Sequence, residues 1–395
     1  MTSFVKRTWA EINLDIAAEN YKLICEKALN LPVVAVIKAD AYGHGATEMA
    51  HLYENMGVKL LAVSGVDEGI ELRNSGIKTP ILIFGYTPVD DVIKLSKYDM
   101  IQTIYSAQYA RIMSAAAVQA NITIKIHIKL DTGMGRLGFD CCGDEMVPSG
   151  AAAALEAANL RGFSVSGIYT HFSAADSTET SDKDFTEKQY QRFSDAVTFL
   201  KENGVNTGFV HCSNSAALLT HEGKGLDGVR AGIILYGLAP SGDVAVPSGI
   251  KSVMQFKSTV TMVKTASVGD TFSYGRTYTA KGDMRVATVC VGYADGYPRA
   301  ASGKGRVIIH GKYCKILGRV CMDQIIVDVT VLDDVEIGDE VILIGHDADH
   351  EITADEVAGY MSSINYEVVC DIGTRVPRVY IKNGEIVKVI NRIIQ

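Results

Sequence analysis

The first part of the chain alternates short apolar segments with longer polar or amphipathic stretches. Stretches such as 67–74, 107–120 and 185–202 have the composition and spacing of helices. Eight apolar segments of strand length occur between residues 31 and 237: 32–37, 59–63, 80–84, 100–105, 123–130, 164–170, 208–211 and 228–235. Strand-then-helix repeated about eight times in roughly 200 residues predicts an α/β fold, a TIM-like (β/α)8 barrel. A doubly wound open sheet is the alternative, and it is disfavoured because no GxGxxG turn follows the first strand.

After Pro240 the pattern changes to β-branched segments separated by glycine turns. These segments are 253–268, 285–291, 306–310, 315–330, 340–345 and 377–390. In the last of them, Asn383-Gly384 between two apolar runs is a strong signal for a two-residue hairpin. One helix is expected, at 352–363. We therefore predict a barrel domain at 11–240 and a mostly-β domain at 241–395, which residues 1–10 are expected to join, with a linker at 240–249.

Composition limits the classes of function. The net charge of -8 disfavours nonspecific binding to nucleic acid. The N-terminus lacks the apolar core of a signal peptide, and no uninterrupted apolar run is long enough to span a membrane. The eight cysteines form no CxxC pair and no zinc-like spacing with histidine, so we expect no metal site. Reduced thiols in a cytoplasmic protein are the expected state.

A lysine at the end of the first predicted barrel strand is the first candidate for chemistry. The apolar run 33–37 is followed by Lys38-Ala39-Asp40-Ala41-Tyr42-Gly43-His44-Gly45. A strand end at a barrel rim leaves the lysine half desolvated, which lowers the pKa of its amine and suits a nucleophile or a base. From these residues alone, a lysine that simply extends to solvent is the alternative.

Other predicted strand ends carry polar residues that packing alone does not explain. The fifth strand carries a cationic row on one face, formed by Lys125, His127 and Lys129, with Lys129 nearest the rim and Arg136 in the loop that follows. The others are His171 after the sixth strand, Asn214 and Ser215 after the seventh, and Arg230, Gly232 and Ile233 in the eighth. Asn214 and Ser215 begin a predicted helix, where unpaired backbone N–H groups favour an anion such as phosphate. From the residues alone, structural lysines, a satisfied histidine and a plain helix cap remain alternatives.

Taken in order, these motifs resemble those of the alanine racemase family. The match runs from Trp9 to Arg378 and includes AVIKADAYGHG, DTGMGRLG, GIYTHF, SNSAA, RAGI, FSYG, VGYADG, GRVCMDQ and INYE. The resemblance implies that Lys38 forms a Schiff base with pyridoxal 5′-phosphate (PLP) and that the protein interconverts L-alanine and D-alanine. The D-alanine is expected to supply bacterial peptidoglycan. A homodimer whose active site is shared between subunits is also implied.

The resemblance assigns roles to individual residues. Lys38 and Tyr274 correspond to the two catalytic bases, which act on opposite faces of the substrate Cα. Arg230 corresponds to the residue at the pyridine nitrogen, where an arginine donates a hydrogen bond and keeps that nitrogen unprotonated. Lys129 corresponds to a lysine that is often carbamylated. The remaining implied contacts are Tyr42, His171, Asn214, Ser215, Gly232, Ile233 and Tyr366 for the cofactor, and Arg136, Met322 and Tyr293 for the substrate.

Other activities are weighed against this one. A serine or broad-spectrum amino-acid racemase would carry the same motifs, because a methyl and a hydroxymethyl group differ little in binding terms. A barrel-type PLP decarboxylase has an acidic residue where this chain has Arg230, and Cys321 lies in a racemase-type GRVCMDQ. A non-catalytic, single-barrel PLP-binding protein would lack the second domain and Tyr274.

Overall fold

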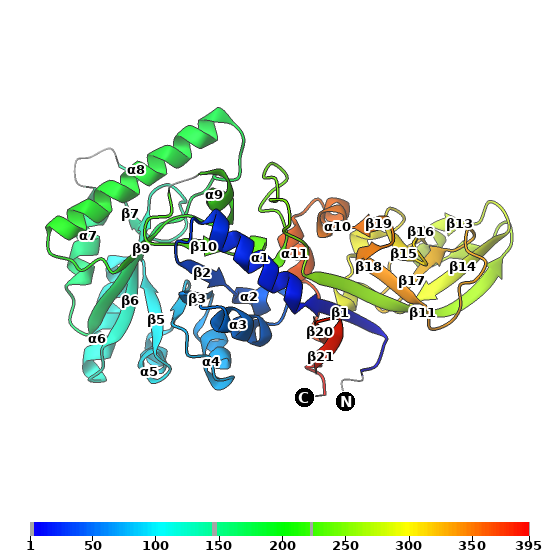
Figure 1. Cartoon of the computed structure of the whole chain (residues 1–395), viewed down its shortest axis with the longest axis horizontal. Coiled ribbons are helices and arrows are strands. Elements are labelled where there is room, and N and C mark those ends of the chain that lie inside the picture. The colour runs from blue at the N-terminus through cyan, green and yellow to red at the C-terminus, as the bar shows by residue number, and fades with distance from the viewer. Residues whose placement is uncertain (1–3, 144–147, 222–223, 395) are drawn as a thin grey trace. The chain divides into compact units, whose positions relative to one another are not determined.

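The computed structural model describes residues 4–143, 148–221 and 224–394 (Figure 1). The chain divides into two compact units. The barrel unit comprises Ala18–Ala41 and Ala46–Ile250, and the β unit comprises Met1–Ala17, Tyr42–Gly45 and Lys251–Gln395. The short segment Tyr42–Gly45, four residues after Lys38, therefore belongs to the β unit, although barrel residues flank it on both sides. In the described part of the chain, no helix has both the length and the apolarity that crossing a bilayer requires.

Eight parallel strands form the sheet of the barrel unit, in the order β10-β2-β3-β4-β5-β6-β8-β9. A bridge between His211 and Gly228 links β9 to the residue before β10, so the sheet nearly closes on itself. The strands are β2 (Val33–Val36), β3 (Leu60–Val63), β4 (Ile81–Ile83), β5 (Met100–Ile104), β6 (Ile124–Asp131), β8 (Phe163–Tyr169), β9 (Phe209–His211) and β10 (Val229–Ala231), and the short β7 (Phe139–Asp140) pairs with β6. The predicted (β/α)8 barrel is confirmed, and the open-sheet alternative is wrong.

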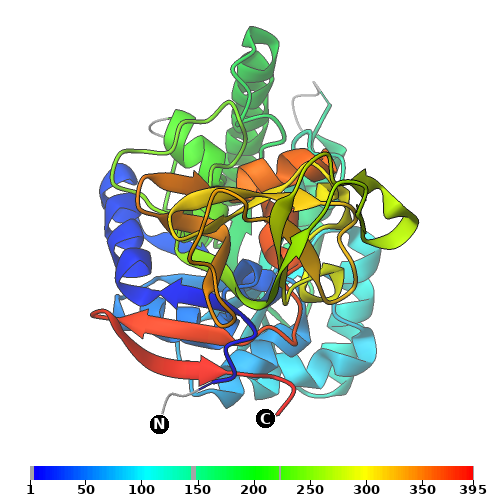
Figure 2. The same ribbon diagram turned by 90° about the vertical axis from the view of Figure 1, so that its right-hand side faces the viewer.

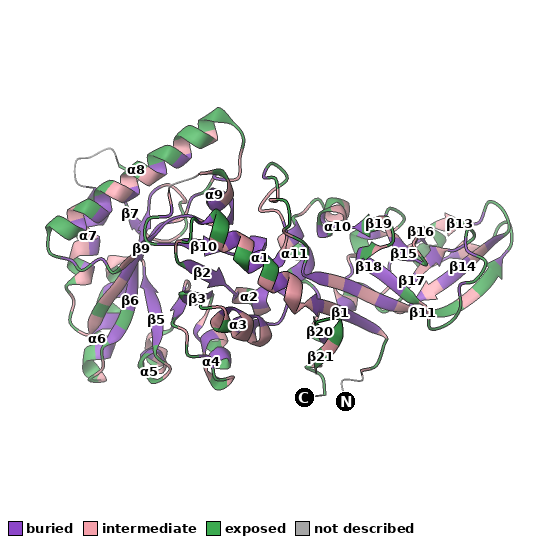
Figure 3. Cartoon of the chain, in the orientation of Figure 1, coloured by how far each residue is buried: buried purple, intermediate pink, exposed green. Residues whose placement is uncertain are grey.

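Burial on both faces explains why the barrel strands are continuous apolar runs. All residues of β2, β3, β4 and β5 are buried, and Figure 3 colours these strands purple. The last predicted segment is only partly a strand. After β10, Gly232 adopts φ −115° and ψ −107° and turns the chain, so η2 (Ile233–Tyr236) is a 3-10 helix. The expectation of a strand across all of 228–235 is therefore wrong.

Helices follow the barrel strands. They are α1 (Leu14–Lys27), which the two units share, α3 (Ala46–Asn55), α4 (Val66–Asn74), η1 (Val89–Asp91), α5 (Val92–Lys97), α6 (Ala107–Gln119), α7 (Ser149–Ala158), α8 (Thr180–Glu202) and α9 (Ser215–Thr220). The predicted helices at 67–74, 107–120 and 185–202 correspond to α4, α6 and α8. In α8, Phe193, Ala196, Val197 and Leu200 are buried at helical spacing, and Figure 3 colours much of the remaining helix green (exposed) or pink (intermediate).

The β unit has a ten-stranded sheet in the order β19-β18-β15-β16-β17-β14-β11-β1-β20-β21. Because β11 also pairs with β18, the strands from β18 to β11 close into a ring. The strands are β1 (Thr8–Asn13), β11 (Met254–Ala266), β14 (Met284–Val289), β15 (Arg306–Ile309), β16 (Lys312–Leu317), β17 (Ile325–Asp328), β18 (Glu340–Asp347), β19 (His350–Ile352), β20 (Arg378–Lys382) and β21 (Glu385–Ile390), with a separate pair β12 (Thr271–Phe272) and β13 (Tyr278–Thr279). The prediction of a mostly-β second part is confirmed.

Local backbone conformation decides two predictions in the β unit, the hairpin at Asn383-Gly384 and the strand at 315–330. Asn383 and Gly384 both have positive φ, 52° and 76°, as a tight turn between antiparallel β20 and β21 requires, so the predicted hairpin is confirmed. Figure 2 shows this red hairpin beside the blue β1. The segment 315–330 is two strands, because Gly318 (φ 69°) turns the chain after β16.

The β unit also contains short helices: η3 (Tyr274–Arg276), η4 (Tyr293–Asp295), η5 (Arg299–Ala301), α10 (Ala354–Met361) and α11 (Asn365–Cys370). Of these, α10 corresponds to the helix predicted at 352–363.

Candidate active site

The chain makes a left-handed turn directly after Lys38. Ala39, Asp40, Ala41 and Tyr42 have φ between 52° and 54°, in the segment labelled α2 (Lys38–Tyr42) in Figure 1. A residue other than glycine costs about 1–2 kcal/mol in this conformation. Such a run persists only where its surroundings hold it, and it reverses the chain within a few residues of the strand end. The turn presents Lys38, which is half-buried, at the barrel rim.

The two glycines of the Tyr42-Gly43-His44-Gly45 segment are required by close packing within the β unit. Both have positive φ, 79° and 93°. A side chain at Gly43 would overlap the carbonyl oxygen of Val369, and one at Gly45 would overlap the hydroxyl of Tyr380. Two structural requirements therefore account for the AYGHG pattern. Its first residues belong to the left-handed turn, and its two glycines allow the backbone to pack closely within the β unit.

Arg230 is a buried cation without a bonded carboxylate among the described residues. It is 3% exposed, and its Nη2 donates to the carbonyl oxygens of Thr170 and Cys212, both at 2.8 Å. Nη1 donates to His211 Nδ1 at 2.9 Å and Nη2 to His171 Nδ1 at 3.2 Å. Burial lowers the pKa of Arg230 to about 10, so it remains charged at neutral pH. No described residue accepts a hydrogen bond from its Nε, which leaves one donor for a ligand.

The histidines around Arg230 are neutral. Because an arginine only donates, Nδ1 of His171 and Nδ1 of His211 must accept, which puts the ring hydrogen of each on Nε2. His211 Nε2 then donates to His127 Nδ1 at 3.3 Å. Burial, followed by the charge of Arg230, lowers the pKa of His127 to about 3 and holds the pKa values of His171 and His211 well below the usual range. The positive charge of this group is thus held by Arg230.

Lys129 and Lys125 lie on one strand, β6, but in opposite environments. Lys125 is half-exposed and pairs with Asp99 at 2.7 Å. Lys129 is 5% exposed, its Nζ has no hydrogen-bond partner among the described residues, and it lies 5.1 Å from the centre of the Tyr169 ring. Burial, and secondly the charge of Arg230, lower the pKa of Lys129 to about 7. The cationic row expected on this strand is therefore divided between an ion-paired lysine at its outer end and, at its inner end, a buried amine that the described residues leave unpartnered.

The loop after β6 is shaped by one carboxylate. Asp131 Oδ1 accepts from the backbone N–H groups of Gly133, Met134 and Gly135 at 3.0, 2.9 and 3.1 Å. This turn explains the DTGMG pattern and carries the next residue, Arg136, which is exposed. The charge of Arg136 contributes to lowering the pKa of Lys129, whereas the larger effect of the Asp131 carboxylate raises it.

The residues expected around phosphate lie together after β9 and β10. Asn214 is the N-cap of α9, and its side chain accepts from Ala217 N–H at 2.9 Å. Ser215 Oγ accepts from Gly232 N–H at 2.9 Å, and the next residue, Ile233, is buried. The bond between Ser215 and Gly232 therefore joins two separate segments of the barrel rim, and Asn214 and Ile233 are the chain neighbours of these two residues. Their role as phosphate contacts stays a prediction.

The other predicted residues lie in the β unit. The rings of Tyr42 and Tyr366 meet edge-on with centroids 6.0 Å apart, and burial, followed by the nearby Tyr366, raises the pKa of Tyr42. Tyr274, Met322 and Tyr293 are large but 71%, 52% and 43% exposed.

Hydrogen bonds bring the segments of these three exposed residues together. Beside Tyr274, Ser273 Oγ donates to the Arg319 carbonyl at 2.6 Å, three residues before Met322. The N–H of Tyr293 donates to the Cys321 carbonyl, and that of Ala294 to the Met322 carbonyl, both at 3.1 Å. The three predicted side chains therefore belong to one hydrogen-bonded region of the β unit.

Sequence reasoning gave no role to several residues that hold this site. The Tyr169 ring is stacked on His211, with centroids 5.0 Å apart, and its centre is 5.4 Å from Arg230 Cζ. Tyr169 precedes His171 by two positions, as His127 precedes Lys129. Because alternate residues of a strand face the same side, that spacing was the available signal.

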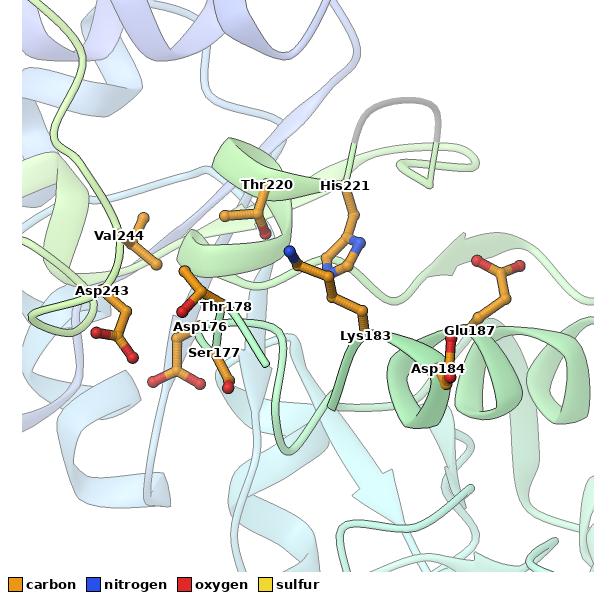
Figure 4. Close-up of a pocket in the computed structure, with 10 residues that line it drawn as sticks. All are labelled: Asp176, Ser177, Thr178, Lys183, Asp184, Glu187, Thr220, His221, Asp243 and Val244. Carbon is orange, nitrogen blue, oxygen red and sulfur yellow. The ribbon is translucent and has the colours of Figure 1, made fainter. Parts of the chain in front are cut away.

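A separate cavity on the barrel unit contains none of the predicted site residues (Figure 4). Its volume is about 520 Å³. Its charged lining consists of the carboxylates Asp176, Asp184, Glu187 and Asp243 with Lys183 and, beside them, His221. Four carboxylates repel an anion, so this cavity is unsuited to the phosphate of a cofactor.

Comparison with known proteins covers both units. Residues 12–240 match the family model of the alanine racemase N-terminal domain, and residues 253–380 match that of the C-terminal domain. The chain belongs to the alanine racemase family. The resemblance expected from the ordered motifs is thus confirmed, and this alanine racemase family consists of PLP-dependent isomerases.

Individual alanine racemases match over the full length. Alanine racemase 1 of Clostridium acetobutylicum is 41% identical over 100% of both chains. The solved alanine racemase of Clostridium difficile 630 is 38% identical with a TM-score of 0.91, covering 98% of this chain and 99% of that one. The alanine racemase of Bacillus anthracis, solved with bound L-Ala-P, is 37% identical with a TM-score of 0.90, covering 99% of each chain.

Proposed function

We propose that this protein interconverts L-alanine and D-alanine with PLP as its cofactor. Full-length similarity to alanine racemases supports the reaction. The observation that carries the proposal within the site is Arg230, a buried cation among neutral groups with one donor nitrogen to spare. A carboxylate at that position would instead hold a protonated pyridine ring, which suits the decarboxylase alternative.

The residues of the barrel unit fit PLP on three counts. Nε of Arg230 can donate to the pyridine nitrogen, since no described residue accepts from it. Ser215 Oγ and Gly232 N–H already lie 2.9 Å from each other, so both can turn to phosphate oxygens once that bond opens. Lys38 lies at the end of β2, where its amine can bond to the cofactor. When bound, PLP withdraws electrons from the substrate Cα and makes the Cα proton acidic.

Arg230 and His171 control protons around the ring nitrogen. The pKa of about 10 keeps Arg230 charged at neutral pH, so it donates a hydrogen bond and does not transfer its proton. The neutral His171 accepts from Arg230 at Nδ1 and offers its Nε2 hydrogen on the other side. By donating a hydrogen bond without giving up its proton, Arg230 would keep the ring nitrogen unprotonated and so limit how strongly bound PLP could withdraw electrons. That arrangement would favour return of a proton to Cα, which suits racemisation.

Two bases are needed because a proton leaves one face of Cα and another reaches the opposite face. We assign Lys38 Nζ to the face reached from D-alanine and Tyr274 Oη to the face reached from L-alanine. The exposure of Tyr274, Met322 and Tyr293 supports a homodimer in which this region of one subunit serves the partner's Lys38. Roles for Tyr42, Tyr366 and Asn214 as cofactor contacts, and for Arg136 as a substrate contact, stay predictions.

Lys129 is proposed to be carbamylated. Its neutral amine nitrogen attacks the carbon of CO₂, an N–C bond forms, the π bond to one oxygen breaks with its electron pair going to that oxygen, and the nitrogen loses one proton to solvent. The resulting anion supplies the hydrogen-bond acceptors that Arg136 can use. The unpartnered, buried Nζ and the pKa of about 7 support this modification.

A cytoplasmic location and a supply of D-alanine to peptidoglycan are proposed with the activity. All eight cysteines are unpaired, which agrees with a reducing compartment.

The reaction is tested by chiral analysis of L-alanine and L-serine, each incubated with purified, PLP-loaded protein. We expect conversion to near equal amounts of L- and D-alanine and slower conversion of serine. Protein reduced with borohydride is the control and should be inactive. Faster conversion of serine would favour the broad-spectrum alternative, and absence of D-alanine despite full PLP loading would contradict the proposal.

A further inference from the structure

We propose that Glu68 is a positioning residue for Lys38, because its carboxylate fixes the peptide group that follows the lysine. The proposal rests on the proposed function only in taking Lys38 as the lysine that binds PLP. Glu68 lies in the first turn of α4, the helix that follows β3, and belongs to none of the motifs that carry the family resemblance.

The Glu68 carboxylate joins two loops of the barrel rim. Its Oε1 accepts from the backbone N–H of Ala39 at 2.7 Å. Its Oε2 accepts from the N–H groups of Ser64 and Gly65 at 2.5 and 3.1 Å. Ser64 and Gly65 directly follow β3, the strand that pairs with β2. The carboxylate therefore ties the residue after Lys38 to the end of the neighbouring strand.

With the bond from Ala39 N–H to Glu68, the backbone is held on both sides of Lys38. On its N-terminal side, Ile37 N–H donates to the Ala62 carbonyl at 2.9 Å, and Val36 is in register with Ala62. On its C-terminal side, the Ala39 N–H belongs to the same planar peptide group as the Lys38 carbonyl. Holding that N–H fixes ψ of Lys38, and therefore the direction in which its side chain leaves the strand.

The left-handed turn makes the bond necessary. Ala39 is the first of the four left-handed residues and is exposed, so water could replace the carboxylate and φ of Ala39 could relax to negative values. Relaxation at this residue would redirect the chain immediately after Lys38. A carboxylate accepts such a bond more strongly than water or a neutral group does.

Helix capping alone is the competing explanation. Through Oε2, Glu68 also closes the capping box of α4 at Gly65. Capping alone predicts a loss of stability without a change at Lys38. Glu68→Asp separates the two roles, because a side chain one methylene shorter can still accept from Gly65 but cannot also reach Ala39. Asp67→Asn is the matched control, since it removes an exposed carboxylate from the same helical turn.

The experiment uses the PLP-loaded, full-length protein at a temperature well below its unfolding transition. In Glu68→Asp and Glu68→Ala, we expect kcat for alanine to fall about tenfold or more while KM changes less than about twofold. Hydrogen exchange at the Ala39 amide should be about tenfold faster. The pH at which the visible absorbance of the Lys38-bound cofactor changes should shift. Asp67→Asn should match the wild type, and Glu68→Asp should keep its melting temperature.

Unchanged kcat and unchanged exchange at Ala39 in Glu68→Asp and Glu68→Ala would reduce Glu68 to a helix cap and overturn the proposal. A fall in kcat without faster exchange at Ala39 would also overturn it, because the effect would not pass through this peptide group. Failure of the proposed function can be told apart from failure of this proposal. If the wild-type protein had no racemase activity, hydrogen exchange at the Ala39 amide would still show whether Glu68 holds that peptide group.

Discussion

Depletion of carbon dioxide, combined with a change of pH, tests the carbamylation of Lys129. The amine of this residue is buried and has no hydrogen-bond partner in the described part of the chain. A carbamate would convert this unpartnered group into an anion near the cations Arg230 and Arg136, and the nearby Asp131 carboxylate would oppose it. We expect the modification to form spontaneously from dissolved CO₂ and to be lost when CO₂ is removed.

The magnitude follows from the environment of the amine. Burial and the charge of Arg230 lower the pKa of Lys129 from 10.5 to about 7. At pH 8, an amine with that lowered pKa is about 90% neutral, whereas an ordinary lysine is about 0.3% neutral, an enrichment of about 300-fold. Only the neutral amine reacts with CO₂. Occupancy should therefore be high above about pH 8 and should fall as the pH drops through about 7 and the amine takes up a proton.

The assay is carbon-13 NMR of protein equilibrated with ¹³C-bicarbonate, with racemase activity measured in parallel. One carbamate resonance is expected at pH 8, and it should weaken at pH 6 and in CO₂-free buffer. Lys129→Met should lack the resonance and lose activity. Lys125→Met is the matched control on the same strand, because Lys125 is half-exposed and ion-paired with Asp99. A resonance that persists in Lys129→Met, or that never forms in the wild type, would refute the reasoning.

Three other results test the remaining assignments. Borohydride treatment of the PLP-loaded protein should fix the cofactor on Lys38, and mass mapping of the adduct to another lysine would contradict this. Arg230→Glu should allow the pyridine nitrogen to be protonated, which slows racemisation by about a hundredfold and raises transamination, measured as pyruvate. If Arg230→Glu changed neither the racemisation rate nor the ratio of racemisation to transamination, Arg230 would not have the role assigned to it. Lys38→Ala and Tyr274→Phe homodimers should be nearly inactive, but equal co-refolding gives about half mixed dimers and restores about a quarter of all sites. No recovery, in mixed dimers verified by mass spectrometry, would exclude a shared site.

Local pattern was enough to predict the architecture. Barrel strands are buried on both faces, so each is a continuous apolar run that is visible without any partner. The same periodicity put Lys38 and His171 at strand ends, and the rule that function lies at the C-terminal rim of a barrel made them candidates. Asn383-Gly384 predicted its hairpin because the turn geometry depends on those two residues alone.

Local pattern failed where one residue redirects the backbone. The segment 228–235 is uniformly apolar, yet Gly232 turns the chain out of the sheet. The stretch after Lys38 contains two alanines and a tyrosine, which ordinarily avoid left-handed conformations, and no propensity predicts a run of four residues with φ near 53°. Packing within the β unit and the bonds to Glu68 and Asp40 hold that turn.

Charge state was decided only by tertiary structure. Lys125 and Lys129 alternate on one strand and look alike in sequence, but one ends in solvent beside Asp99 and the other ends inside the barrel. The neutrality of His171 comes from burial and from Arg230, which is 59 residues away in the chain. Sequence determines which groups a strand carries and toward which face they point. Their protonation depends on how much water and which charges surround them, and residues distant in the chain supply both.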